Sequence, residues 1–161
     1  MNFVFNNTAL VALAGIDLIE SLPRLGDEFS CPVAVKEEFG RGPGTRELPR
    51  WLRVEAVSYE QVNRFPALLR LGAGEREAVA LAETKGGVFV SDDRVARSVA
   101  EGLGVRITGT LGILARLFQS CAFEHDVLGQ HVRALRYMGL LHLSDRLEAE
   151  ILRVQKAPSI L

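Results

Sequence analysis

The segment Val88–Arg94 most constrains the fold of this chain, because it joins a short β-branched run directly to a helix pattern. Val88–Ser91 predicts a buried strand, and two carboxylates, Asp92 and Asp93, separate it from the predicted helix Arg94–Glu101. In open α/β sheets, ligands bind at the carboxyl ends of the strands, so acids at this point are placed for metal or phosphate chemistry. The alternative is that Asp92 or Asp93 only caps the helix that follows. The sequence leaves both interpretations open.

Strand patterns alternate with helix patterns along the first two thirds of the chain. This alternation predicts an α/β fold with βαβ units and a parallel sheet of roughly four to five strands flanked by helices. The predicted strands are Asn2–Asn6, Glu28–Cys31, Leu52–Val57, Val88–Ser91 and Gly104–Thr108. The first predicted helix begins after Thr8 as its N-cap, is interrupted at Gly15, resumes over Ile16–Leu22 and ends at Pro23. The other predicted helices are Pro32–Phe39, Glu75–Thr84, Arg94–Glu101 and Thr110–Ser120. The pattern of Ser58–Leu71 is ambiguous.

The last third of the chain departs from this alternation. His125–Gly139 and Ser144–Gln155 are predicted as two extra helices that pack on the sheet or on a partner subunit. The apolar run Met138–Leu143 fits either the core or the face of a homodimer. All 161 residues are expected to form one domain.

Composition and charge exclude several classes of protein. The net charge of −1 gives no general attraction to nucleic acid or to anionic membranes, so a polyanionic partner would need a local basic patch. Cys31 and Cys121 lie far apart and outside any CxxC spacing, which argues against a structural zinc site and a disulfide scaffold. No apolar run is long enough to cross a bilayer, and the chain does not begin like a signal peptide. A cytoplasmic location is therefore expected.

Two further patterns are too weak to indicate a cofactor. Gly72–Gly74 resembles the start of a dinucleotide-binding fingerprint but lacks the third glycine, so no nucleotide cofactor is expected. His125, His131 and His142 lack the one-turn spacing of a helical metal pair. Surface or packing roles are predicted for these histidines.

Polar clusters stand at the element ends where an α/β fold would gather them: Asn7–Thr8, Glu38, Glu77 and Asp92–Asp93. Five segments carry the pattern: NTALVAL from Asn7, PVAVKEE from Pro32, LGAGEREA from Leu71, FVSDDR from Phe89 and GTLGIL from Gly109. No single segment is specific. In this order, they resemble the PIN-domain superfamily, and specifically a PIN-like subfamily related to the VapC-type toxins of toxin–antitoxin systems.

The resemblance implies a three-layer PIN-like fold with an acidic pocket that holds Mg²⁺ or Mn²⁺ and hydrolyses RNA phosphodiester bonds. Glu38, Glu77 and Asp93 match the catalytic acids and metal ligands of this pocket, and Thr8 and Ser91 match the small hydroxyl residues beside it. Mg²⁺ prefers hard oxygen ligands, and carboxylates can hold it against the scissile phosphate. Clustered acids also repel one another, so at least one should have a raised pKa when no metal is bound.

Asp92 and Asn7 differ from the pattern of the implied pocket. Asp92 is an extra acid that either binds metal or caps a helix. Asn7 stands where nuclease members carry the first metal-binding aspartate, and its amide oxygen can bind a cation but brings no negative charge and cannot act as a base. Asn6 is not expected to replace that acid, because it too is uncharged and because adjacent strand residues point to opposite faces. The resemblance therefore predicts a ribonuclease of weakened activity, or alternatively a catalytically degenerate protein that binds an antitoxin protein or RNA.

Arginines cluster in the glycine-rich segment after the second predicted helix. Arg41, Arg46 and Arg50 could guide an RNA backbone towards the pocket, or they could simply be solvated. The resemblance also implies a homodimer and an antitoxin protein as partners.

Overall fold

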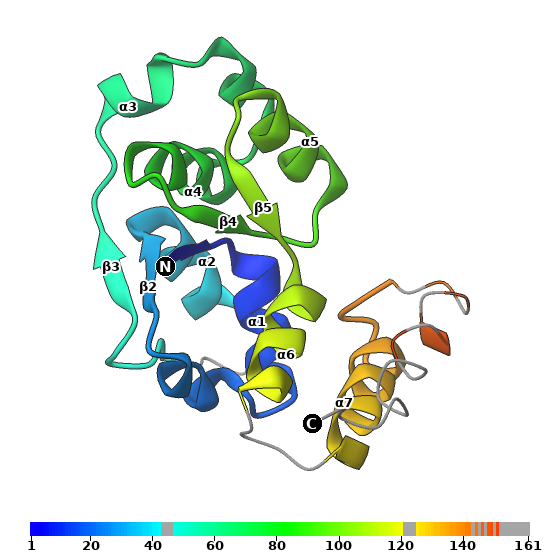
Figure 1. The fold of residues 1–161 in the computed structure, drawn as a ribbon. Helices are drawn as coiled ribbons and strands as arrows, with labels where there is room; N and C mark the ends of the chain where they lie inside the picture. The colour runs from blue at the N-terminus through cyan, green and yellow to red at the C-terminus, as the bar shows by residue number, and fades with distance from the viewer. Residues whose placement is uncertain are drawn as a thin grey trace.

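A five-stranded parallel sheet forms the centre of the protein in a computed structural model that describes residues 1–42, 47–120, 125–142, 144, 146, 148, 149 and 151 (Figure 1). The strands are β1 (Asn2–Phe5), β2 (Glu28–Pro32), β3 (Arg53–Glu55), β4 (Val88–Val90) and β5 (Arg106–Thr108). They lie in the order β3-β2-β1-β4-β5, and every neighbouring pair is parallel. The predicted α/β fold with a parallel sheet flanked by helices is confirmed.

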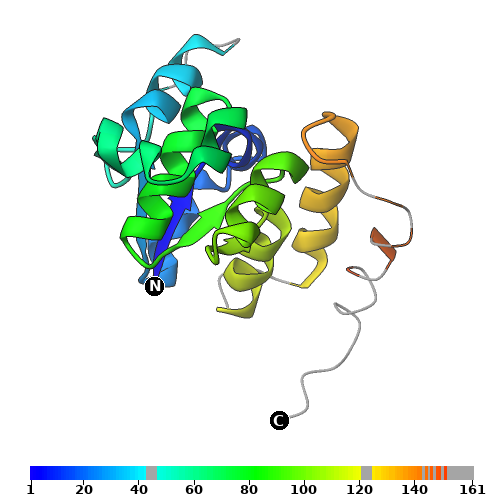
Figure 2. The ribbon, with the colours of Figure 1, turned by 90° about the horizontal axis from the view of Figure 1, so that it is seen from above.

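The helices lie before, between and after these strands. The α-helices are α1 (Asn7–Gly15), α2 (Val33–Arg41), α3 (Tyr59–Asn63), α4 (Ala73–Thr84), α5 (Arg94–Gly102), α6 (Thr110–Gln119) and α7 (His125–Tyr137). Two 3₁₀ helices, η1 (Ile19–Leu25) and η2 (Pro66–Arg70), complete the set. Helix α4 packs against β1, β2 and β4, whereas α6 packs against α1, η1 and β5. Helix α7 packs on α6, at the outside of the sheet assembly (Figures 1 and 2).

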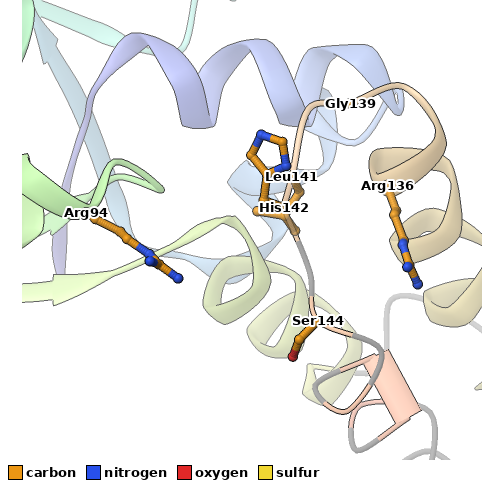
Figure 3. Close-up of a pocket in the computed structure, with 6 residues that line it drawn as sticks. All are labelled: Arg94, Arg136, Gly139, Leu141, His142 and Ser144. Carbon is orange, nitrogen blue, oxygen red and sulfur yellow. The ribbon is translucent and has the colours of Figure 1, made fainter.

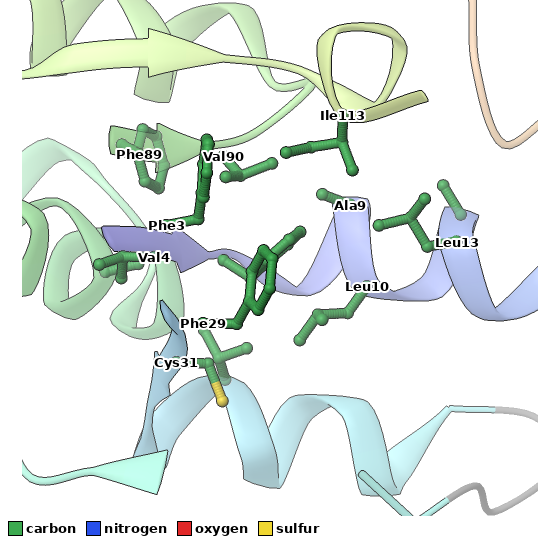
Figure 4. Close-up of a cluster of buried hydrophobic side chains, with 14 of the residues drawn as sticks. Phe3, Val4, Ala9, Leu10, Leu13, Phe29, Cys31, Phe89, Val90 and Ile113 are labelled. Atoms are coloured by element: carbon green, nitrogen blue, oxygen red, sulfur yellow. The ribbon is translucent and has the colours of Figure 1, made fainter. Parts of the chain in front are cut away.

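The hydrophobic core centres on the two middle strands. All residues of Phe3–Phe5 and of Val88–Val90 are buried, as expected for strands of a parallel sheet that is covered by helices. Phe3 stacks on Phe29 of β2 with 5.7 Å between the ring centroids, and Leu10 of α1 and Ile113 of α6 close the cluster (Figure 4). This packing joins β1 to β2 and to the helices α1 and α6.

The order of the strands creates a switch point between β1 and β4. The chain continues from β1 to β2 on one side and from β4 to β5 on the other, so the connections leave these two neighbours in opposite directions. In open α/β sheets, ligands bind in the crevice at such a point, beyond the carboxyl ends of the strands. A ligand site is therefore expected at the residues that follow Phe5 of β1 and Val90 of β4.

Several predicted boundaries are wrong for identifiable local reasons. Asn6, not Thr8, caps α1, because its side-chain oxygen accepts a hydrogen bond from the backbone N–H of Ala9. The α-helix does not resume over Ile16–Leu22: Asp17 has a positive φ of 56°, and the chain continues as the 3₁₀ helix η1, which contains Pro23. Pro32 caps α2 rather than entering its first turn.

The remaining differences concern the middle and the end of the chain. The ambiguous segment 58–71 contains α3 and η2, and Ser58 caps α3 with a reciprocal capping box to Gln61. The first extra C-terminal helix is α7, whereas most of Ser144–Gln155, like Cys121, lies outside the described residues. No helix among the described residues is long and apolar enough to cross a membrane.

Candidate functional site

A buried hydrogen-bonded junction joins the carboxyl ends of β1 and β4. The Asn6 side-chain amide donates to Ser91 Oγ at 2.7 Å, and both residues are almost completely buried. Ser91 Oγ also accepts from the backbone N–H of Asp93 at 3.1 Å, and Asn6 Oδ1 accepts from Thr8 Oγ1 at 2.8 Å. Ser91 and Thr8 therefore both contact Asn6, and their supporting role beside an acidic pocket stays a prediction.

Asp93 begins α5 at this junction. Its Oδ1 accepts from the backbone N–H of Ala96 at 2.8 Å, so Asp93 is the helix cap that the sequence offered as one of two interpretations. Capping occupies one carboxylate oxygen and holds the side chain in a defined place. The second oxygen of Asp93 forms no hydrogen bond with the described residues, so capping leaves this oxygen for another role.

Glu38 reaches the site from α2 by contacting the first turn of α4. Its Oε1 accepts from the backbone N–H of Gly74 at 3.0 Å. A Cβ atom at position 74 would lie 2.5 Å from Glu38 Oε2, so only glycine permits this approach without moving the carboxylate. Gly74 therefore helps to position the Glu38 carboxylate, both by its backbone hydrogen bond and by its lack of a side chain.

Glu75 is the carboxylate whose electrostatic environment is most clearly perturbed. Burial raises its pKa, and the neighbouring charges of Asp93 and Glu38 raise it further, against a hydrogen bond from the Gly72 N–H. The carboxylates of Glu38 in α2 and of Asp93 at the start of α5 thus lie near enough to Glu75 in α4 for both charges to act on it. The acid with the raised pKa is therefore Glu75, which is not one of the site acids that the resemblance implied.

Asp92 has a structural role in the described geometry. Its two oxygens accept from the backbone N–H of Thr110 at 2.9 Å and from Thr110 Oγ1 at 2.5 Å. Thr110 is completely buried at the start of α6. Asp92 therefore connects the end of β4 to the first turn of α6. Its hydrogen bonds stabilise the start of α6 and not that of α5.

The sequence predicted Glu77 and Asn7 as site residues. In the structure, Glu75 and Asn6 make the contacts at this edge of the sheet. Glu77 lies two residues, or about 200°, further round α4 than Glu75, and it forms no hydrogen bond or ion pair with any described residue. Asn7 is the first residue of α1; its Oδ1 is buried, and no described residue donates to it. Asn6 brings no negative charge either, but it lies at this edge because it follows the last residue of β1 and its side chain caps α1.

Sequence signals existed for both of the missed residues. Asparagine is among the strongest N-cap residues, and Asn6 directly precedes the helix pattern. Gly72 and Glu75 have the spacing of a capping box, which places a glutamate at the third helical position. The contacts of Glu75 with distant acids, however, have no local signal.

The predicted metal ligands do not form a closed cage. Among the described residues, no group of three or more His, Cys, Asp or Glu side chains is arranged to hold a metal ion. Asn6 is neutral, and Glu38 and Asp93 each have an oxygen bound to a backbone N–H. Mg²⁺ in phosphoryl-transfer sites, however, is usually held by one or two carboxylates, several waters and the substrate phosphates. The set fits a cation that is shared with a phosphate and does not fit one that the protein holds alone.

Of the predicted RNA-guiding arginines, the structure describes Arg41 and Arg50, and neither forms an ion pair with Glu38, Glu75 or Asp93. Arg41 forms an exposed pair with Glu37 at 3.6 Å, one turn earlier in α2. Arg50 is exposed, and Arg46 lies outside the described residues. Their role in substrate binding stays a prediction.

Comparison with protein-family models identifies a family that spans nearly the whole chain. A protein-family model described as a PIN domain, DUF3368, matches residues 2–157. A comparison with curated proteins finds no match. The matched range includes every element of the sheet and every residue of the candidate site.

Proposed function

This chain belongs to the PIN-domain family, whose domain suggests nuclease-type function, and from this premise we propose that it acts on RNA as a weak, VapC-type endoribonuclease. The observation that carries the proposal is the convergence of Glu38, Glu75 and Asp93 at the switch point of the sheet. Titratable groups that perturb one another in a crevice are typical of functional sites.

The three carboxylates would divide the work of phosphodiester hydrolysis. Asp93, whose second oxygen capping leaves unbonded to the described residues, would hold a divalent cation, Mg²⁺ or Mn²⁺, together with the substrate. When bound, such a cation would stabilise charge on the phosphate and supply an activated water. Glu75 is suited to hold a proton, because a raised pKa brings a carboxylate closer to the pH at which it works. Glu38, fixed by Gly74 N–H, would orient the reacting groups.

The experiment compares two glutamates on the same helix. RNA cleavage is measured with Mn²⁺ for the natural protein, Glu75→Gln and Glu77→Gln. Glutamine keeps the hydrogen bond to Gly72 but cannot accept a proton, so Glu75→Gln should lower cleavage on the order of a hundredfold. Glu77→Gln, the matched control, should change it less than about twofold, since Glu77 lies two residues further round α4 and forms no hydrogen bond with the described residues. Equal losses in both variants would contradict the assignment of Glu75.

Gly74→Ala provides an independent test of Glu38. The added methyl group displaces the Glu38 carboxylate, whose end is flexible enough to move without unfolding the protein. Gly74→Ala should therefore lower cleavage as much as Glu38→Gln does, and combining the two changes should add little. Full activity of Gly74→Ala would show that the position of Glu38 is unimportant.

A second candidate function is binding without cleavage, to RNA or to an antitoxin protein. The observation that favours it is Asn6, a neutral amide at the end of β1 where a carboxylate would strengthen cation binding. Asn6→Asp is nearly isosteric: one carboxylate oxygen can keep the bonds from Thr8 and Ala9, and the other can accept the Ser91 hydroxyl. An inactive natural protein that gains Mn²⁺-dependent cleavage as Asn6→Asp would establish a degenerate site.

The remaining partners stay predictions. The homodimer was predicted from the run Met138–Leu143, of which Met138 is 54% exposed, Leu141 is buried, and Leu143 lies outside the described residues. Sedimentation of the purified chain would test the dimer, and co-expression with the product of a neighbouring gene would test the antitoxin.

A further inference from the structure

Arg97 of α5 brings a positive charge to the same edge of the sheet as the carboxylates. It lies one turn after Asp93, and its backbone N–H donates to the Asp93 carbonyl at 3.0 Å. Side chains of a helix lean towards its amino end, so the guanidinium reaches back to the end of β4. There, Arg97 Nη1 donates to the backbone carbonyl of Ser91 at 3.4 Å. Ser91 Oγ accepts from the Asp93 N–H, so Ser91 contacts both the guanidinium and the residue that caps α5.

Gly109 leaves the space that this guanidinium occupies. A Cβ atom at position 109 would lie 2.9 Å from Arg97 Nη1 and 2.6 Å from Asp92 Oδ1. Contacts this short would force one of the two side chains to move, and Thr110 holds the Asp92 carboxylate in place. The lack of a side chain at Gly109 therefore helps to keep the Arg97 guanidinium beside the ends of β4 and β5.

Most hydrogen-bond donors of Arg97 have no partner in the described part of the chain. A guanidinium group has five N–H donors, and the described residues accept one long hydrogen bond from this one and form no ion pair with it. The side chain is partly buried, but its Nε and Nη2 atoms are not, so both atoms face solvent. Nε and Nη2 lie on one edge of the group, and such an edge can bind two oxygens of a phosphate at once.

The other arginine of α5, Arg94, extends in a different direction. Figure 3 shows its side chain reaching from the start of α5 towards the segment that carries His142 and Ser144. Arg94 is exposed, and it forms no hydrogen bond or ion pair with its side chain in the part of the protein that the structure describes. Contacts with Ser91 and the space at Gly109 position Arg97 instead, so Arg97 is the arginine of α5 that is placed for a ligand at the carboxyl ends of the strands.

RNA that approaches the carboxylates needs a positive charge nearby. Its phosphates are repelled by Glu38, Glu75 and Asp93, and a fixed guanidinium offsets part of this repulsion. We propose that Arg97 binds a backbone phosphate of RNA through Nε and Nη2 and so positions the strand at Asp93. This inference rests on the proposed action on RNA and adds a substrate-binding residue to it. A phosphate contact of this kind holds the strand without reading its sequence.

The test measures the affinity of a fluorescein-labelled single-stranded oligoribonucleotide in EDTA, which keeps binding separate from cleavage. Arg97→Ala should weaken binding on the order of tenfold and should reduce the slope of log K against log salt by about 0.7, because one phosphate contact is lost. Arg97→Lys should lose less, since it keeps the charge but not the paired donors. Arg106→Ala is the matched control and should change neither quantity: Arg106 also donates to a backbone carbonyl, that of Gly86 at 2.7 Å, but at the amino ends of β4 and β5.

A DNA strand of the same sequence identifies the group that Arg97 contacts. DNA has the same phosphates but lacks the 2′-hydroxyl groups, so Arg97→Ala should weaken DNA binding and RNA binding by the same factor. A loss confined to RNA would mean that Arg97 contacts the ribose, and the phosphate assignment would be wrong. In cleavage assays, Arg97→Ala should raise KM much more than it lowers kcat, because the contact is made before the reaction begins.

The outcomes separate this inference from the proposed nuclease. If Arg97→Ala binds RNA with unchanged affinity and salt dependence, Arg97 holds no phosphate, yet cleavage sensitive to Glu75→Gln would still support the nuclease. If Arg97→Ala weakens binding but the natural protein does not cleave RNA, the phosphate contact stands and the nuclease is wrong. An equal loss in Arg97→Ala and Arg106→Ala would reflect net charge alone and would overturn the contact. Thermal unfolding of each variant identifies misfolding, and if Arg97→Ala does not fold, the smaller loss expected in Arg97→Lys decides.

Discussion

The two edges of the sheet hold their acids in opposite ways. At the amino edge, Asp27 pairs with Arg116 at 2.6 Å, and Glu28 pairs with Arg53 at 3.6 Å. At the carboxyl edge, Glu38 and Asp93 accept hydrogen bonds from backbone N–H groups, and neither forms an ion pair within the described part of the chain. Charges at the amino edge are neutralised where they stand, whereas the carboxyl edge retains negative charge that a ligand can meet.

The pKa values follow this difference. Burial would raise the pKa of Asp27, but hydrogen bonds from the terminal ammonium group and from Arg116 outweigh it and hold the pKa below its usual value. Burial also raises the pKa of Glu75, and there the neighbouring charges of Asp93 and Glu38 act in the same direction. Asp27 thus stabilises the fold when ionised, whereas the ionised form of Glu75 costs stability, which is typical of a group kept for function.

The largest effect is expected from breaking the pair at the amino edge. Asp27 is only 8% exposed, so Asp27→Ala leaves the Arg116 guanidinium partly buried without its carboxylate. The free energy of unfolding, measured with urea at neutral pH, should fall by about 2–3 kcal/mol. The contribution of Asp27 is complete above its unfolded pKa of 3.8 and is lost as pH falls through the lower folded value. A variant whose loss does not shrink in strong acid would contradict this role.

Asp92 sharpens the comparison, because it lies at the carboxyl edge but behaves like a structural acid. Asp92→Ala removes both acceptors of the buried Thr110, and stability should fall by about 1–2 kcal/mol. Cleavage by the folded variant, assayed well below its melting temperature, should be reduced much less than in Glu75→Gln. A complete loss of cleavage in a stable Asp92→Ala protein would place Asp92 among the catalytic groups instead.

Glu75→Gln should increase the free energy of unfolding at neutral pH, whereas Asp27→Ala and Asp92→Ala should lower it. The folded state binds the Glu75 proton more tightly than the unfolded state, so the stability of the natural protein falls as pH rises from 4.5 through the raised folded value. Glutamine avoids this loss but gives up the attraction of a carboxylate to the start of α4, so the gain at pH 7 should stay below about 1 kcal/mol. Urea unfolding at pH 7 and pH 4 measures it, and the gain should disappear at the lower pH. If Glu75→Gln destabilises the protein at pH 7, the ionised Glu75 carboxylate does not cost stability in the folded state.

Local patterns were sufficient to predict the sheet but not the contacts of the site. The runs Phe3–Phe5 and Val88–Val90 are apolar throughout, so burial on both faces could be predicted from composition alone. The alternation rule failed at Asn6 because it was applied one residue beyond the end of β1, where the backbone enters a helix cap. Choosing between Glu75 and Glu77 required the contact of Gly74 with Glu38, a residue 36 positions earlier, and no local pattern contains that information.

The smallest effect is expected from the second pair at the amino edge, and it tests whether pairing or burial distinguishes the two edges. Glu28 and Arg53 start neighbouring strands, but their side chains are 58% and 64% exposed. Glu28→Gln should change the free energy of unfolding by less than about 0.5 kcal/mol, because solvent screens an exposed pair and the side chains lose entropy in forming it. The Asp27→Ala variant, unfolded under the same conditions, is the reference. If both variants lose the same stability, the charge pairing itself stabilises the amino edge; if only Asp27→Ala does, the burial of the Asp27 carboxylate beside Arg116 is what makes its pairing effective.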